Sequence, residues 1–185
     1  MQTELVARAR GGDREAFAVL AGGAVDRLHA VARLILRDAD LAQDAAQEAL
    51  LRAWRDLPTL RDVDRFDGWL YRLVVRACAD VGRHRRRWRA EVVVLPNEPA
   101  EQDHAGALAD RDLLERGLRR LTDAQRSVLV LSFYVGLTPT ELGEALEIPV
   151  GTANSRLHYA IEALRAALAA DQRSIDGDLA KERSA

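Results

Sequence analysis

Apolar residues recur along most of the 185-residue chain at the three- and four-residue spacing of amphipathic helices, and no stretch shows sustained strand alternation. Asp13 fits the N-cap of a first helix whose apolar stripe comprises Phe17, Leu20, Ala24, Leu28, Val31 and Leu34. A second helix is predicted over about 40–56, ending before Pro58. After a loop at 58–65, a third helix is predicted to be capped by Asp67 and to bury Phe66, Leu70, Leu73, Val74, Ala77 and Val81.

Residues 91–110 interrupt this pattern, because they include five acidic residues, two prolines and one glycine but no Lys or Arg. Such a composition is typical of a flexible linker. Helical spacing resumes at Arg111 and continues to about Ala170, and the polar residues 171–185 predict a flexible tail. We therefore expect an all-α fold in which two small helical domains, 1–90 and 111–170, are joined by a flexible acidic linker.

The clearest local motif lies in the second domain. Thr138 and Glu141 form a capping box, with Pro139 at the first helical position and with Leu142 and Leu146 on the buried side. A tight turn at 147–149 leads to a helix expected to bury Val150, Ala153, Leu157, Ile161, Leu164 and Leu168. A second capping box, Thr122 with Gln125, begins the preceding helix, which is predicted to end near Gly136. Two closely joined helices, the second with a polar outer face, indicate a DNA-binding helix-turn-helix or, alternatively, an ordinary helical hairpin.

Positive charge is concentrated in one segment of a chain whose net charge is only −2. Eight arginines and two aspartates lie between residues 65 and 89, which gives a local charge of +6. Neutralising DNA phosphates requires such a concentration, and Tyr71 and Trp88 offer rings for base stacking. By itself, the basic run at 81–91 is equally compatible with a solvated helix face or a targeting tag.

The sequence shows no pattern typical of an enzyme. The four histidines lack metal-ligand spacing, the lone Cys78 has no partner, and no glycine loop suited to phosphate is present. We therefore expect no catalytic activity, no metal and no cofactor. A single cysteine fits a reducing compartment, and no apolar stretch approaches a secretory core or a membrane span, which predicts a cytoplasmic protein without membrane insertion.

Two segments together resemble a known family. The stretch LTDAQRSVLVLSFYVGLTPTELGEALEIPVGTANSRLHYAIEALRAAL resembles region 4 of the sigma-70 family, and DAAQEALLRAWRDL followed by FDGWLYRLVVRACADVGRHRRR resembles region 2. With only these two regions and a short linker, the chain is similar to extracytoplasmic-function (ECF) sigma factors. The resemblance implies that 1–90 docks on core RNA polymerase and melts the minus-ten element, and that 111–170 recognises the minus-thirty-five element. It also implies an anti-sigma factor as a partner.

The resemblance further implies roles for individual residues. Docking on core polymerase falls to Asp44, Gln47, Glu48 and Arg52. The loop 59–66 matches the loop that holds a flipped minus-ten base, and the implied minus-ten contacts are Arg61, Arg65, Arg72, Arg76, Arg83, His84, Arg86 and Arg87. The implied minus-thirty-five contacts are Thr152, Asn154, Ser155, Arg156, His158 and Tyr159.

The chain departs from the family pattern at four places, one of which is Pro139-Thr140, where an acidic pair is common at the start of the first helix of the helix-turn-helix. Arg76 stands where many members have Asn, and Asn154 stands where Lys or Arg is usual. Gly82 replaces an apolar residue and costs roughly 1 kcal/mol of helix propensity relative to Ala, which predicts a bend or fraying of the basic helix. Trp54 and Trp69 occupy positions expected to be core.

Two alternatives stay open at this point. A helix-turn-helix regulator that acts without joining polymerase would need residues 1–90 to sense a ligand, yet this half shows no apolar pocket signal. A sigma-like protein whose polymerase or promoter contact has decayed is also compatible with Arg76 and Asn154.

Overall fold

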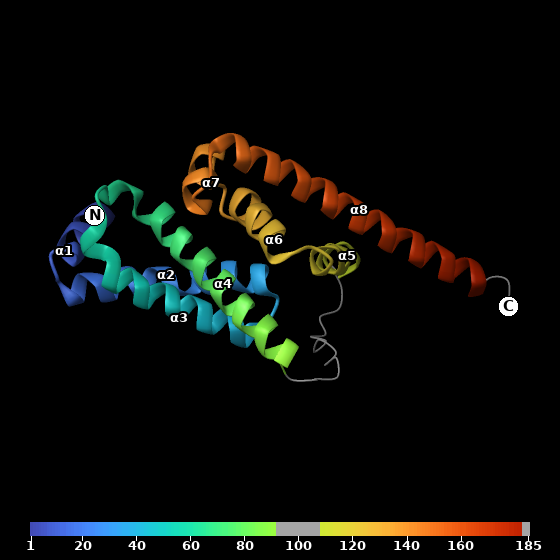
Figure 1. Ribbon diagram of the computed structural model, residues 1–185, viewed down its shortest axis with the longest axis horizontal. Coiled ribbons are helices and arrows are strands. Elements are labelled where there is room, and N and C mark those ends of the chain that lie inside the picture. Colours follow the sequence, from blue (N-terminus) through green and yellow to red (C-terminus); the bar gives the residue numbers. More distant parts are fainter. Residues whose placement is uncertain (92–107, 183–185) are drawn as a thin grey trace.

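The computed structural model describes the backbone of residues 1–91 and 108–182, with side chains at 1–85 and 113–171. The described residues form only helices and turns, which confirms the all-α prediction. The first half comprises α1 (Gln2–Arg10), α2 (Arg14–Leu36), α3 (Ala39–Asp56) and α4 (Phe66–Glu91) (Figure 1). The second half comprises α5 (Leu108–Arg119), α6 (Asp123–Leu129), α7 (Pro139–Leu146) and α8 (Val150–Glu182).

Three of the four side-chain caps that the sequence predicts begin a helix. The Asp13 carboxylate accepts hydrogen bonds from the backbone N–H groups of Glu15 and Ala16, both at 3.0 Å. Both predicted capping boxes, at Thr122 and Thr138, are confirmed. The prediction of a cap at Asp67 is wrong, because α4 already begins at Phe66 and leaves Asp67 inside its first turn.

Several boundaries differ from the prediction. The segment predicted as a loop contains two 3₁₀ turns, Leu57–Thr59 and Val63–Arg65, and the second runs directly into α4. Helix α4 continues without a break through Gly82, so the predicted fraying is absent there. Helix α8 extends to Glu182, which makes the predicted helix end near residue 170 wrong. The expected linker falls mostly outside the described residues.

Helices α2, α3 and α4 pack around a core of aliphatic and small side chains that includes Leu28, Ile35, Leu70 and Val74. Trp69 lies in this core as predicted. The prediction for Trp54 is wrong: the indole is 38% exposed and packs one side against the Phe17 ring, at a centroid distance of 4.9 Å. Val150 is also exposed rather than buried, because it lies in the first turn of α8.

The two halves of the chain share one hydrophobic core. Leu131, Leu142 and Ala145 belong to the same buried cluster as the residues of α2, α3 and α4, and α7 lies beside α4 (Figure 1). A smaller cluster around Leu121, Leu129 and Ala160 belongs to the second half alone. The halves are therefore packed directly against each other, an arrangement that the expectation of two tethered domains did not include.

A buried arginine reinforces this contact. The Arg126 guanidinium donates to the Ile35 carbonyl oxygen at the end of α2 at 2.5 Å, and to the Leu121 and Leu118 carbonyl oxygens at 2.6 and 3.0 Å. Burial lowers the pKa of Arg126, while the nearby Asp123 carboxylate opposes that shift. Because arginine stays protonated in proteins, this side chain carries a buried positive charge between the halves.

Candidate nucleic-acid interface

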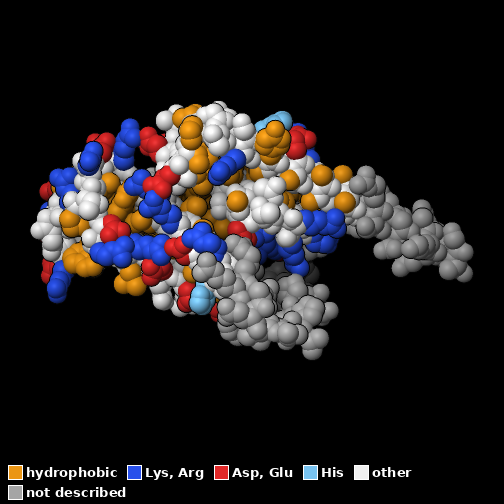
Figure 2. Space-filling view, viewed as in Figure 1, with side chains coloured by type: hydrophobic (Ala, Val, Ile, Leu, Met, Phe, Trp, Pro, Cys, Tyr) orange, Lys and Arg blue, Asp and Glu red, His pale blue; other side chains and the backbone are white. Residues whose placement is uncertain are grey.

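Four arginines form a stripe along one side of α4 and the turn before it. Spacings of seven, four and seven residues bring successive side chains back to nearly the same side of a helix. The stripe consists of Arg65, Arg72, Arg76 and Arg83, of which only Arg72 is half-buried. Figure 2 shows basic and acidic side chains intermixed over the face on which α4 lies. The core residues on the opposite side of α4 fix the direction of this arginine stripe.

Acidic side chains of the second half lie directly against the arginine stripe. Arg65 Nη1 is 2.6 Å from Glu144 Oε1, and Arg72 Nη1 is 3.6 Å from Glu147 Oε1. Arg76 forms an ion pair with the other oxygen of Glu147. Three of the four stripe arginines are thus paired with two carboxylates of the helix-turn-helix.

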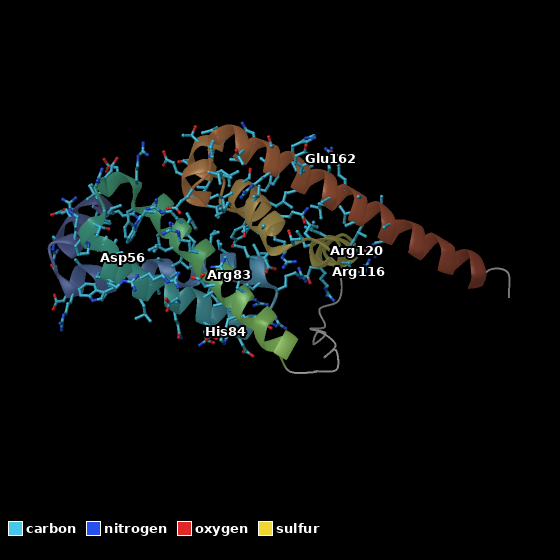
Figure 3. All side chains as sticks on the ribbon, in the orientation of Figure 1. Asp56, Arg83, His84, Arg116, Arg120 and Glu162 are labelled. Carbon is cyan, nitrogen blue, oxygen red and sulfur yellow. The ribbon has the colours of Figure 1, made fainter. Side chains whose placement is uncertain are left out.

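The remaining implied minus-ten residues lie on either side of these pairs. Arg61 is exposed between the two 3₁₀ turns and forms no ion pair with the described residues. Arg83 and His84 are exposed on α4, and Arg83 pairs with Asp80 (Figure 3). The side chains of Arg86 and Arg87 lie outside the described residues.

Two further side chains of α4 have partners within the protein. Arg85 Nη1 is 2.8 Å from Asp38 Oδ2 at the start of α3. The Tyr71 ring is buried, with the Arg27 guanidinium 5.4 Å from its centroid. Burial also raises the pKa of Tyr71. Tyr71 is therefore not available for the base stacking that the sequence suggests, and the Trp88 side chain lies outside the described residues.

One carboxylate joins the arginine stripe to the neighbouring helix α3. Asp80 pairs with Arg83 through one oxygen, while Arg52 Nη1 lies 2.8 Å from the other. Arg52 Nε also lies 2.7 Å from Glu48. Burial lowers the pKa of Arg52, but the hydrogen bonds to Glu48 and Asp80 outweigh this effect and raise it. Arg52 thus holds α3 to α4.

The other implied docking residues point outward from α3. Asp44 and Gln47 are exposed, and Glu48 is half-buried. Leu51 follows on the same side of the helix and is 66% exposed. The sequence does not identify this residue, because the apolar pattern does not distinguish an exposed leucine from a buried one. A polar, acidic face with an exposed leucine is suited to a protein partner with basic and apolar groups.

The outer face of the helix-turn-helix is open. All six implied contacts, Thr152, Asn154, Ser155, Arg156, His158 and Tyr159, are exposed on α8, whereas Ala153 and Ala160 are buried on its other side. The close turn before α8 depends on Gly143, since a Cβ there would lie 3.0 Å from the Ile148 carbonyl oxygen. Such a helix face can enter a DNA major groove.

Other kinds of site find no support in the part of the chain that the structure describes. No three or more His, Cys, Asp or Glu side chains gather there in a way suited to a metal ion. None of the described helices is long and apolar enough to cross a membrane.

Comparison with known proteins gives the family. Sigma-70 region 2 matches residues 24–90, and sigma-70 region 4 matches residues 117–166. The RNA polymerase sigma-H factor of Pseudomonas aeruginosa is 34% identical over 183 residues, covering 89% of this chain and 92% of that protein. The chain belongs to the sigma-70 family. The ECF RNA polymerase sigma factor SigL of Mycobacterium tuberculosis is 35% identical over 136 residues, covering 71% of this chain and 76% of that protein.

A solved structure shares the fold over most of the chain. The structure of CnrH in complex with the cytosolic domain of CnrY superposes with a TM-score of 0.66 at 27% identity, covering 92% of this chain and 98% of that chain. The resemblance noted from the sequence is therefore confirmed. As an ECF sigma factor, the protein directs promoter-specific initiation by RNA polymerase.

Proposed function

We propose that this sigma factor opens promoter DNA along the arginine stripe of α4, reads the minus-thirty-five duplex with α8, and docks on core polymerase through α3. The observation that carries this proposal is the alignment of four arginines on one side of a helix whose other side is fixed in the core. Residues 1–90 and 111–170 would then act as the minus-ten and minus-thirty-five domains, joined by the linker at 91–110.

Strand opening requires binding free energy rather than bond chemistry. Removing a base from the stack costs a few kcal/mol, and protein contacts to the flipped base and the strand must compensate. The two 3₁₀ turns present Arg61 beside the arginine stripe, where phosphates of a separated strand would meet Arg72, Arg76, Arg83 and His84. Arg86 and Arg87 continue this basic segment in the sequence. The protein would thus work without catalytic residues, metals or cofactors.

Recognition of the minus-thirty-five element would rest on hydrogen bonds more than on charge. Asn154 and His158 offer both donors and acceptors to base edges, Ser155 offers an acceptor, and Arg156 is suited to a phosphate. Ser155 Oγ donates to the Gly151 carbonyl oxygen at 2.9 Å, so its lone pairs face outward as acceptors. Thr152 and Tyr159 complete the exposed face.

Docking on polymerase would use the outer side of α3, with Asp44, Gln47 and Glu48 as polar contacts. Arg52 would position Glu48 rather than contact polymerase itself, because its guanidinium is paired with Glu48 and Asp80. The family resemblance also supports an anti-sigma factor as a partner and a cytoplasmic location. The related CnrH was solved with the cytosolic domain of another protein, CnrY.

The decisive experiment adds the purified protein to core RNA polymerase and maps the 5′ ends of transcripts from genomic DNA. Promoter-specific starts above the core-alone background are expected. A helix-turn-helix regulator that does not join polymerase would produce none and would not co-purify with the core enzyme.

A second experiment tests the arginine stripe. The double variant R76A/R83A is compared with R14A/R165A, which removes two exposed arginines elsewhere. We expect normal core binding but poor promoter opening, measured by permanganate reactivity of unpaired thymines. The slope of log affinity against log salt should fall by about 0.7 for each phosphate that the variant no longer neutralises. Unchanged opening in R76A/R83A would contradict the role given to α4.

A further inference from the structure

Glu147 occupies an unusual backbone position for its residue type. It follows the last residue of α7 with φ of 55°, in the left-handed region where helix ends most often carry glycine. Side chains other than Asn and Asp rarely adopt this conformation. The conformation aims the Glu147 carboxylate at two stripe arginines, Arg72 and Arg76. A glycine would satisfy the turn but would remove both ion pairs.

Glu144, one helical turn earlier, continues the contact. It pairs with Arg65 at 2.6 Å, so two carboxylates on one side of α7 face three arginines along α4. Phosphates of a DNA strand would bind the same guanidinium groups that these carboxylates pair with. The carboxylates and a DNA strand therefore compete for the same side chains.

These ion pairs form the rim of a buried contact. Beneath them, Leu142 and Ala145 of α7 lie in the core shared with α4, and Arg126 bonds to the Ile35 carbonyl oxygen nearby in the same contact between halves. Surface pairs alone contribute little, but pairs that border a packed interface add to a contact that is already formed. We call this arrangement, in which the two halves are packed together, the closed form.

The closed form affects the two DNA surfaces unequally. The six exposed residues on α8 remain accessible, whereas Arg65, Arg72 and Arg76 of the stripe are paired with Glu144 and Glu147. We propose that Glu144 and Glu147 form an acidic clasp that occupies the minus-ten surface in the free protein and leaves the minus-thirty-five surface available. Separation of the halves on polymerase then releases the stripe. This inference rests on the proposed function of α4.

The test uses the full chain and the variant E147Q, which removes one charge and keeps the side-chain shape. The control is E162Q, which removes one charge from α8 at a position away from α4 (Figure 3). The probe is a short fluorescein-labelled single-stranded DNA of random sequence, and its binding is followed by anisotropy. We expect free E147Q to bind about three- to tenfold more tightly than wild type, because its open population rises by that factor.

Cys78 provides an independent measure of opening. Its thiol lies in the shared core, where burial and the Asp123 carboxylate raise its pKa to about 12. Reaction with a thiol reagent at mild pH must therefore proceed through open molecules. The labelling rate should rise in E147Q by the same factor as DNA binding, and should stay unchanged in E162Q.

Measurements on the holoenzyme distinguish release of the clasp from a general loss of charge repulsion between Glu147 and DNA. Once bound to core polymerase, E147Q and wild type should bind the strand equally, because the halves are already apart. An equal gain in E162Q, an equal gain in the holoenzyme, or no gain in the free protein would each overturn the clasp. Failure of the proposed function is recognised separately, as absence of promoter-specific starts with wild-type protein.

Discussion

Arg126 links the two halves, and its replacement by Met should separate them. The guanidinium is only 7% exposed and serves the carbonyl oxygens of Ile35, Leu118 and Leu121 as well as Asp123. Methionine fills a similar volume but donates nothing, so Asp123 and three carbonyl oxygens lose a donor. Breaking a buried charged contact of this kind costs about 3–5 kcal/mol. That is a large fraction of the roughly 5–15 kcal/mol that stabilises a typical protein.

The positions of the tryptophans allow unfolding of the first half to be followed separately from unfolding of all the helices. Trp54, Trp69 and Trp88 all precede the linker, so fluorescence reports the first half, whereas far-UV circular dichroism reports all helices. In wild type we expect coincident urea transitions, because the halves share one core. In Arg126→Met, the dichroism transition should fall by about 2 M urea, for a slope near 2 kcal/mol/M, and should precede the fluorescence transition.

A matched control and a clear contrary result complete the test. Arg165→Met removes an arginine whose side chain is 71% exposed and paired only with Glu162 among the described residues, so its stability should change by less than about 0.5 kcal/mol. Arg126→Lys should fall between the two, since the ammonium keeps the charge but loses the planar fork. Coincident transitions in Arg126→Met with a loss below about 1 kcal/mol would refute the reasoning.

Two further outcomes are expected. Leu51→Asp should weaken binding to core polymerase about tenfold in a polarisation assay. The control Val19→Asp, at a similarly exposed position on α2, should not weaken it. Equal effects of the two substitutions would show that Leu51 is not part of the docking face. Because the folded protein holds the Cys78 pKa near 12, wild type should lose about 1.4 kcal/mol of stability per pH unit above about 9, relative to Cys78→Ala. Below pH 9 the thiol is neutral in both folded and unfolded chains, and this contribution is fully present. Parallel denaturation profiles between pH 9 and 11 would contradict the burial of this thiol.

Elements with strong periodicity and a local cap could be predicted from the sequence. Helix α2 combines a six-residue apolar stripe with Asp13, and α7 combines a capping box with Pro139. Helix α1 escaped prediction because it buries only Val6 and Ala9, too few residues to establish a period. The cap prediction at Asp67 is wrong because a 3₁₀ turn capped by Asp62 runs directly into α4, so the helix begins before Asp67.

For the candidate site, the sequence predicts which side chains are exposed, but it does not predict which acidic residues pair with the arginines. Polar residues on α8 are exposed because their apolar neighbours at three- and four-residue spacing turn inward. The partners of Arg65 and Arg76 lie 79 and 71 residues away, so no local pattern encodes them. Arg126 illustrates the same limit, since its burial depends on the end of α2 arriving beside α6.

The shared carboxylate of Asp80 has a consequence for how mutants of this protein should be compared. Asp80 divides its two oxygens between Arg52 on the docking side and Arg83 on the DNA side. An alanine at Arg52 leaves Asp80 wholly to Arg83, and an alanine at Arg83 leaves it wholly to Arg52. Free-energy changes at these two positions will therefore not add, and a defect in promoter opening caused at Arg52 does not by itself place that residue on DNA.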